Sequence, residues 1–91
     1  MAEKEIWEIV LTKPAKRVYE KAGESMRQRL DNYFEDLEQN PLHGNNIKPL
    51  TGQLKGLLRY GVGDWRVIYG LLKGTMKVEI IAILPRGDVY K

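Results

Sequence analysis

Side chains that could hold a phosphate group stand out in the second half of this chain. Arg59 and Arg66 lie in stretches rich in valine, isoleucine and tyrosine, Arg86 follows the last such stretch, and Tyr90 precedes the final residue. An unpaired guanidinium is costly to bury, so an arginine on an apolar strand predicts that an anion meets it. Because a planar guanidinium binds phosphate through paired hydrogen bonds, these residues predict a phosphate-binding site.

Three strands must position these arginines. We predict them at about residues 54–61, 65–72 and 76–84, in apolar segments separated by Gly63-Asp64 and by Lys73-Gly74-Thr75. Both separations are short enough for antiparallel hairpins.

The loop lengths predict which residues share a face of the sheet. A two-residue loop at Gly63-Asp64 would place Arg59 opposite Ile68, on the same face as Arg66. A three-residue second loop would place Leu72 opposite Met76 and Arg66 opposite Ala82. We therefore expect one face to combine cations with small residues that leave room for a ligand, namely Arg59, Gly61, Arg66, Gly70 and Ala82.

The first half of the chain predicts one strand and two helices. Residues 5–11 are rich in β-forming residues, and Thr12 and Pro14 suit the start of a helix that ends at Gly23. A second helix is expected over residues 25–39, since Met26, Leu30, Tyr33, Phe34 and Leu37 form one apolar stripe. Residues 41–53 read as an irregular connection. The predicted fold is α+β, with two helices packed on a four-stranded, largely antiparallel sheet in the order β-α-α-β-β-β.

The composition argues against several kinds of chemistry and against a membrane location. The 91 residues predict a single domain over 1–91, and the absence of cysteine with only one histidine argues against disulfide, thiolate or zinc chemistry. We therefore expect no metal or other cofactor. No segment resembles a signal peptide or has membrane-spanning length, which favours a cytoplasmic protein and no membrane partner.

The net charge of +3 is distributed unevenly. Residues 1–47 hold seven Lys/Arg and nine Asp/Glu, a net charge of −2, whereas residues 48–91 hold eight Lys/Arg and three Asp/Glu, a net charge of +5. A basic second half is expected if that half meets nucleic acid or an acidic protein, although a solvated basic surface would show the same imbalance.

The second half also resembles a known family. The residues Leu50, Gly52, Leu54, Gly56 and Arg59, the run Gly63-Asp64-Trp65-Arg66-Val67-Ile68-Tyr69, and then Arg86, Val89 and Tyr90 are similar to the pattern of the RelE/ParE superfamily of toxins from type II toxin–antitoxin pairs. The length and element order agree over nearly the whole chain. Among its branches, the RelE-like one is favoured, and it cleaves mRNA in the ribosomal A site without a metal.

The resemblance implies roles for particular residues. Arg66, Arg86 and Tyr90 would be catalytic, with Arg66 on the scissile phosphate, Tyr90 as the base for the 2′-hydroxyl proton and Arg86 at the leaving oxygen. RNA binding would involve Arg59, Lys48 and Lys55. The implied partners are a cognate antitoxin, in a possible hetero-oligomer, and the ribosome with its mRNA.

Other readings remain open. Arg66 could pair with Glu79 or Asp64 as a structural ion pair, and Tyr90 could be a surface residue near the terminus. The ParE-like branch poisons DNA gyrase by binding and lacks the arginine–tyrosine set. Leu57 stands where the family carries a basic residue, so a catalytically weak relic that only binds its antitoxin is a third possibility.

Overall fold

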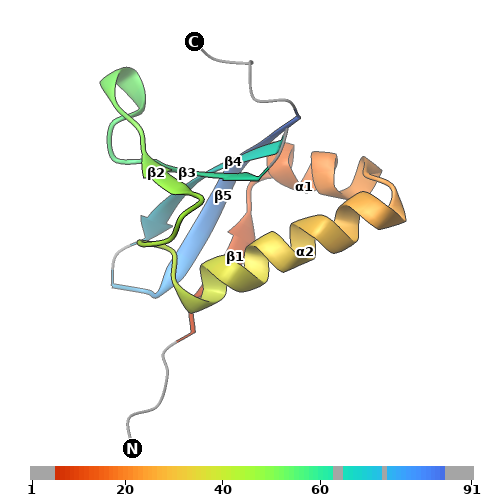
Figure 1. Cartoon of the computed structure of the whole chain (residues 1–91), viewed down its shortest axis with the longest axis horizontal. Helices are drawn as coiled ribbons and strands as arrows, with labels where there is room; N and C mark the ends of the chain where they lie inside the picture. Colours follow the sequence, from red (N-terminus) through yellow and green to blue (C-terminus); the bar gives the residue numbers. More distant parts are fainter. Residues whose placement is uncertain (1–5, 63–64, 73, 86–91) are drawn as a thin grey trace, which may run out of the picture.

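A computed structural model of the chain describes residues 6–62, 65–72 and 74–85. Its elements follow the order β1 (Glu8–Leu11), α1 (Lys13–Lys21), α2 (Glu24–Gln39), β2 (Ile47–Pro49), the short 3-10 helix η1 (Gly52–Leu54), β3 (Leu58–Val62), β4 (Trp65–Leu72) and β5 (Lys77–Pro85). They form a five-stranded sheet with the strand order β1-β5-β4-β3-β2. Strand β1 runs parallel to β5, and the other neighbours are antiparallel. Figure 1 shows both helices on the same side of this sheet.

Local capping explains where the helices begin and end. The Thr12 hydroxyl caps α1 by accepting a hydrogen bond from the Ala15 N–H at 3.4 Å, and it donates to the Ile81 carbonyl oxygen at 3.0 Å. The second bond ties the start of α1 to the sheet. Helix α2 ends at Gln39 because the next residue, Asn40, precedes Pro41 and is extended, since proline disfavours a helical residue before it. Both helices were predicted within one or two residues.

The core lies between the helices and one face of the sheet. The predicted stripe of α2 supplies Leu30, Tyr33, Phe34 and Leu37, with Met26 packed at its margin. The sheet supplies Tyr60, Val67, Tyr69, Val78, Ile80 and Ile83. Because side chains alternate along a strand, the residues between these ones belong to the opposite face, which no described helix covers.

Leu30→Ala should test how much of the stability this core provides. Leu30 is 0% exposed, so truncation leaves a cavity and should lower the free energy of unfolding by about 3 kcal/mol. That loss is a large share of the roughly 5–15 kcal/mol typical of a domain. Urea unfolding followed by circular dichroism measures it. Leu42→Ala is the matched control, since Leu42 is 49% exposed and should change stability little.

The structure corrects the predicted strand count from four to five. Residues 41–53 were expected to be irregular, but Ile47–Pro49 form β2, paired with β3. The strand has only three residues and ends in proline, so it carries no visible alternation. The strand predicted at residues 54–61 also begins later, at Leu58 instead of residue 54, because η1 and Gly56, with a φ of 98°, come first.

The two hairpins differ in how well the sequence predicted them. In the first, Val62 lies opposite Trp65 and Arg59 opposite Ile68, as predicted. In the second, Leu72 lies opposite Lys77 and Arg66 opposite Leu84, so the predicted Met76 and Ala82 pairings are wrong.

Two irregularities cause this difference. Met76 has a φ of 56° and belongs to the turn, and the register shifts between Ile68 and Tyr69. Each displaces the pairing by one residue. The total displacement is therefore two, and because the side-chain period is also two, Ala82 stays on the predicted face.

Candidate phosphate-binding face

Three neighbouring cations, from β2, β3 and β4, lie on the face of the sheet that turns away from the helices. Lys48 lies directly opposite Arg59 in the β2–β3 pair, and Arg66 lies opposite Gly61 in the β3–β4 pair. Directly opposed residues point to the same side, so Lys48, Arg59 and Arg66 form one group, called here the basic face. The directly opposed residues Ile47 and Tyr60 point to the helix side of the sheet, where Ile47 packs against the core and Tyr60 lies inside it.

The spacing within the basic face suits an extended anion. Directly opposed side chains have Cβ atoms roughly 5 Å apart, and diagonal neighbours such as Arg59 and Arg66 roughly 7–8 Å apart. Cations on neighbouring strands at such spacings can be contacted together by one extended polyanion. Sequence reasoning treated Lys48 as a loop lysine. Its place beside Arg59 depends on β2, which no sequence signal revealed.

Gly61 fixes the course of the Arg66 side chain. A Cβ added at Gly61 would lie 3.0 Å from Arg66 Cδ and 3.3 Å from its Nε, so the arginine stem crosses the space that glycine leaves open. Arg66 Nη1 donates to the Trp65 carbonyl oxygen at 3.0 Å. The guanidinium is thus held over β3 beside Gly61.

Gly61→Ala should disturb this arrangement without unfolding the protein. The new methyl group meets the flexible stem of Arg66, which can move, so the free energy of unfolding should change by under about 1 kcal/mol. Because Arg66 is the predicted phosphate ligand, its displacement by about 1 Å should nonetheless lower activity about tenfold or more. Growth inhibition and thermal unfolding measured together check this. Gly23→Ala is the control, since no atom lies within 4 Å of a Cβ added there.

Arg59 lies along the sheet surface. Its Nε atom is buried and has no hydrogen-bond partner in the described part of the chain. Its direct neighbour Ile68 is only 4% exposed although it lies outside the helix-side core. An arginine stem spread over an apolar neighbour leaves the charged end for a ligand.

Leu57 makes the adjoining part of this surface apolar. A Cβ added at Gly70 would lie 3.0 Å from Leu57 Cδ2, so this leucine covers Gly70 on the basic-face side. The small residue at 70 therefore accommodates Leu57, and no open space for a ligand remains there. At this position the family resemblance implied a basic residue.

The other predicted site residues lie elsewhere. Lys55 is exposed just after η1 and is not paired with the arginines in the sheet. Glu79 lies opposite Gly70, four residues from Arg66 and about 13 Å along the strand, which argues against an ion pair between Arg66 and Glu79. Asp64, Arg86 and Tyr90 fall outside the described residues. Pro85, the last described residue, lies opposite Trp65, so β5 ends beside Arg66.

Two core tyrosines are unsuited to act as bases. Burial, together with the hydrogen bond from the Tyr60 hydroxyl to Asp36, raises the pKa of Tyr60, and burial raises the pKa of Tyr69. Tyr69 donates to the Pro41 carbonyl oxygen at 2.7 Å. Both phenols lie on the helix side and serve to anchor the 40–46 loop region and α2.

Neither a metal cluster nor a membrane span is found in the part of the chain that the structure describes. Within residues 6–62, 65–72 and 74–85, no group of three or more His, Asp or Glu side chains could hold a metal ion. No described helix is long and apolar enough to cross a bilayer.

The chain is similar to solved structures of toxins and of toxin–antitoxin complexes. The chain is similar to a chain of the toxin–antitoxin complex RelBE2 from Mycobacterium tuberculosis, with a TM-score of 0.78 and 24% identity over 89% of this chain and 99% of that one. It is also similar to a chain of the archaeal RelE–RelB complex from Pyrococcus horikoshii, with a TM-score of 0.74 and 23% identity over 90% and 97% of the two chains. At these identities the likeness establishes the fold.

Sequence comparison adds the family. A curated relative, Toxin RelE from Mycobacterium tuberculosis, is 43% identical over 44 residues, which are 48% of this chain and 45% of that protein, so the match spans less than half of the relative. The family model described as the ParE toxin of the type II toxin–antitoxin system matches residues 9–90. Because this match covers most of the chain, and the fold agrees with it, the protein belongs to the ParE toxin family within the RelE/ParE superfamily.

Proposed function

We propose that this protein is a ribosome-dependent mRNA endonuclease toxin. The basic face carries the proposal, because Lys48, Arg59 and Arg66 lie side by side on a surface without helices and present cations to an extended polyanion. The local identity to Toxin RelE supports the same branch.

The chemistry assigned to these residues is metal-free transesterification. Arg66 binds the scissile phosphate and stabilises the charge that develops on it, as a preorganised cation does in a transition state. Tyr90 removes the 2′-hydroxyl proton, and Arg86 stabilises the leaving 5′-oxygen. A phenol has a pKa near 10, so neighbouring arginines must lower the pKa of Tyr90 for this role. The ribosome contributes by holding the mRNA in a reactive geometry.

The proposed inhibitor is a cognate antitoxin that covers the basic face. An acidic segment that folds on binding would neutralise Lys48, Arg59 and Arg66 and exclude RNA from them. Co-expression with the protein encoded next to this toxin should then restore growth.

The second candidate function is poisoning of DNA gyrase. The observation that favours it is the description of the matching family model, which is named for ParE toxins. A basic face that binds RNA could also contact DNA or an acidic protein surface, so geometry alone does not separate the two activities.

Mapping of mRNA ends by primer extension after brief expression separates the candidates. Discrete cuts within translated codons, lost when translation is blocked, are expected for the endonuclease. Intact mRNA with double-strand DNA breaks would contradict the proposal and support the gyrase poison. Intact mRNA and DNA together with retained antitoxin binding would identify a relic without activity.

A further inference from the structure

A polar pocket lies where the chain passes from α2 into β2, on the helix side of the sheet. It encloses about 270 Å³ between the last turn of α2, residues 43–46 and the first residue of β2. Figure 1 shows the short loop that joins these two elements. Pockets for drug-sized ligands enclose roughly 300–1,000 Å³, so this pocket suits a single small ring system.

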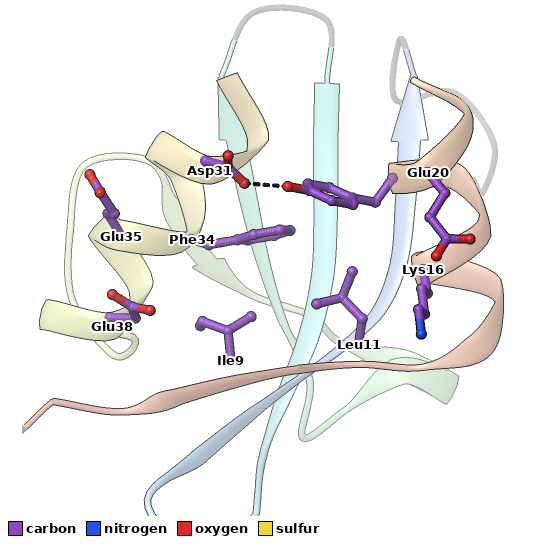
Figure 2. Close-up of a pocket in the computed structure, with 9 residues that line it drawn as sticks. Ile9, Leu11, Lys16, Glu20, Asp31, Phe34, Glu35 and Glu38 are labelled. Carbon is purple, nitrogen blue, oxygen red and sulfur yellow. Dashed lines mark hydrogen bonds between the residues drawn. The ribbon is translucent and has the colours of Figure 1, made fainter. Parts of the chain in front are cut away.

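The carboxylate of Asp36 forms the α2 side of this pocket. Figure 2 shows Glu35 and Glu38 lining a different hollow, towards α1. Because successive residues of a helix are turned by about 100°, Asp36 projects from another side of α2. The Tyr60 hydroxyl donates to Asp36 Oδ2 at 2.5 Å and holds the carboxylate in the pocket. A carboxylate offers about four acceptor positions, so Asp36 can accept further hydrogen bonds from a ligand.

The opposite side of the pocket carries hydrogen-bond donors. Asn40 Oδ1 accepts from the His43 N–H at 3.1 Å, and the Asn46 carbonyl oxygen accepts from the Gly61 N–H at 2.9 Å, so both ends of the loop are fixed. Between these points the side chains of His43, Asn45 and Asn46 line the pocket. Amide and imidazole groups can donate. The pocket therefore places an anionic acceptor opposite neutral donors.

Ile47 supplies an apolar wall and connects the pocket with the basic face. A Cβ added at Gly44 would lie 3.4 Å from Ile47 Cδ1, so the loop backbone passes close to the isoleucine and adds no side chain over it. The next residue, Lys48, points to the other face of the sheet. Since β2 is the outermost strand, only its width separates the pocket from the basic face.

We propose that this pocket binds an unpaired guanine base of an RNA strand whose phosphates lie on the basic face. Guanine presents two adjacent donors, N1–H and the N2 amine, which match the two oxygens of Asp36, and its O6 and N7 accept from the loop side chains. Adenine and cytosine would turn a ring acceptor towards the carboxylate, and uracil has only one donor. An arginine side chain has no acceptor for the loop donors. The proposal rests on the proposed function, to which it adds a second contact with messenger or ribosomal RNA.

Two trinucleotides with 2′-O-methyl groups test the proposal on the full chain. One is adenosine-guanosine-adenosine, and the other has inosine in the middle, which lacks only the N2 amine. Their charges are equal, and neither can be cleaved because the 2′-oxygen is blocked. Calorimetry should show about tenfold weaker binding of the inosine form, as expected for loss of a hydrogen bond to a carboxylate.

Variants of α2 should locate this discrimination. Asp36→Asn should abolish the difference between the two trinucleotides, and thermal unfolding checks that the variant is folded. Glu35→Gln is the matched control and should retain the difference, since Glu35 lines the other hollow. Arg66→Ala should weaken both trinucleotides and keep their ratio, so loss of cleavage and loss of guanine recognition can be told apart.

Equal binding of the two trinucleotides by the wild-type chain would overturn the proposal, and this comparison needs no variant. Displacement of the guanosine form by an equal concentration of acetyl-arginine amide would also overturn it, since the occupant would then be a protein side chain. Kethoxal, which modifies N1 and N2 of unpaired guanine, identifies the source on toxin-bound ribosomes that carry a 2′-O-methylated codon. One messenger or ribosomal guanine should be protected by the wild type and not by Asp36→Asn. No such protection on ribosomes that the toxin occupies would contradict the proposal.

Discussion

Arg66→Ala is expected to abolish growth inhibition while the protein remains folded. Arg66 is only partly buried and lies on the face opposite the core, so its removal leaves no cavity among the core residues. Loss of a cation that stabilises phosphate charge in a transition state typically lowers the rate by about 10²–10³. Cleavage of mRNA on programmed ribosomes measures the rate, and circular dichroism reports the fold.

Two companion variants sharpen this experiment. Arg66→Lys keeps the charge but loses the planar pair of donors, so it should recover only part of the activity. Lys77→Ala removes a cation from β5 far along the strand from Arg66 and should leave cleavage unchanged. If Arg66→Ala unfolds the chain, the arginine has a structural role and the phosphate assignment is wrong.

Tyr90→Phe should lower cleavage by about 10² or more and leave ribosome binding intact. The change removes only the hydroxyl, which general acid–base catalysis requires, and typical contributions of such a group are about 10²–10⁴-fold. Single-turnover cleavage separates this effect on chemistry from any effect on binding. A tyrosine that acts as base should also give a rate that rises with pH up to its pKa.

The control is Tyr19→Phe, which removes a hydroxyl bonded to Asp31 on the helix side of the sheet. It should lower stability slightly and leave the cleavage rate unchanged. Wild-type cleavage by Tyr90→Phe would show that this phenol does not transfer the proton, and Arg86 or a ribosomal group would become the candidate.

Sequence reasoning succeeded where local chemistry determines structure. The apolar period of residues 26–37, the cap at Thr12 and the two-residue spacing at Gly63-Asp64 predicted α2, the start of α1 and the β3–β4 register. That register alone places Arg59 and Arg66 on one face. The arginine pair of the candidate site could therefore be predicted from short-range sequence patterns.

The remaining features depend on contacts between distant segments. Lys48 joins the basic face only because Ile47–Pro49 pair with β3, and three residues are too few to show a period. The shift between Ile68 and Tyr69 moved the β4–β5 pairing and left no mark in the sequence. The Leu57 side chain lies over Gly70 of β4, a contact between residues that are distant in the sequence.

The two edges of the sheet also differ in their tendency to polymerise. Strand β2 offers only three residues for pairing with a strand of another chain. One of them is Pro49, which has no N–H to donate, and Lys48 adds a charge. Short strands, proline and lysine are the usual protection of an edge against aggregation. Strand β1 has no proline within Glu8–Leu11, so in concentrated solutions of the isolated protein, chains should stack through β1 first. Shielding of that one edge would therefore improve solubility more than any change at β2.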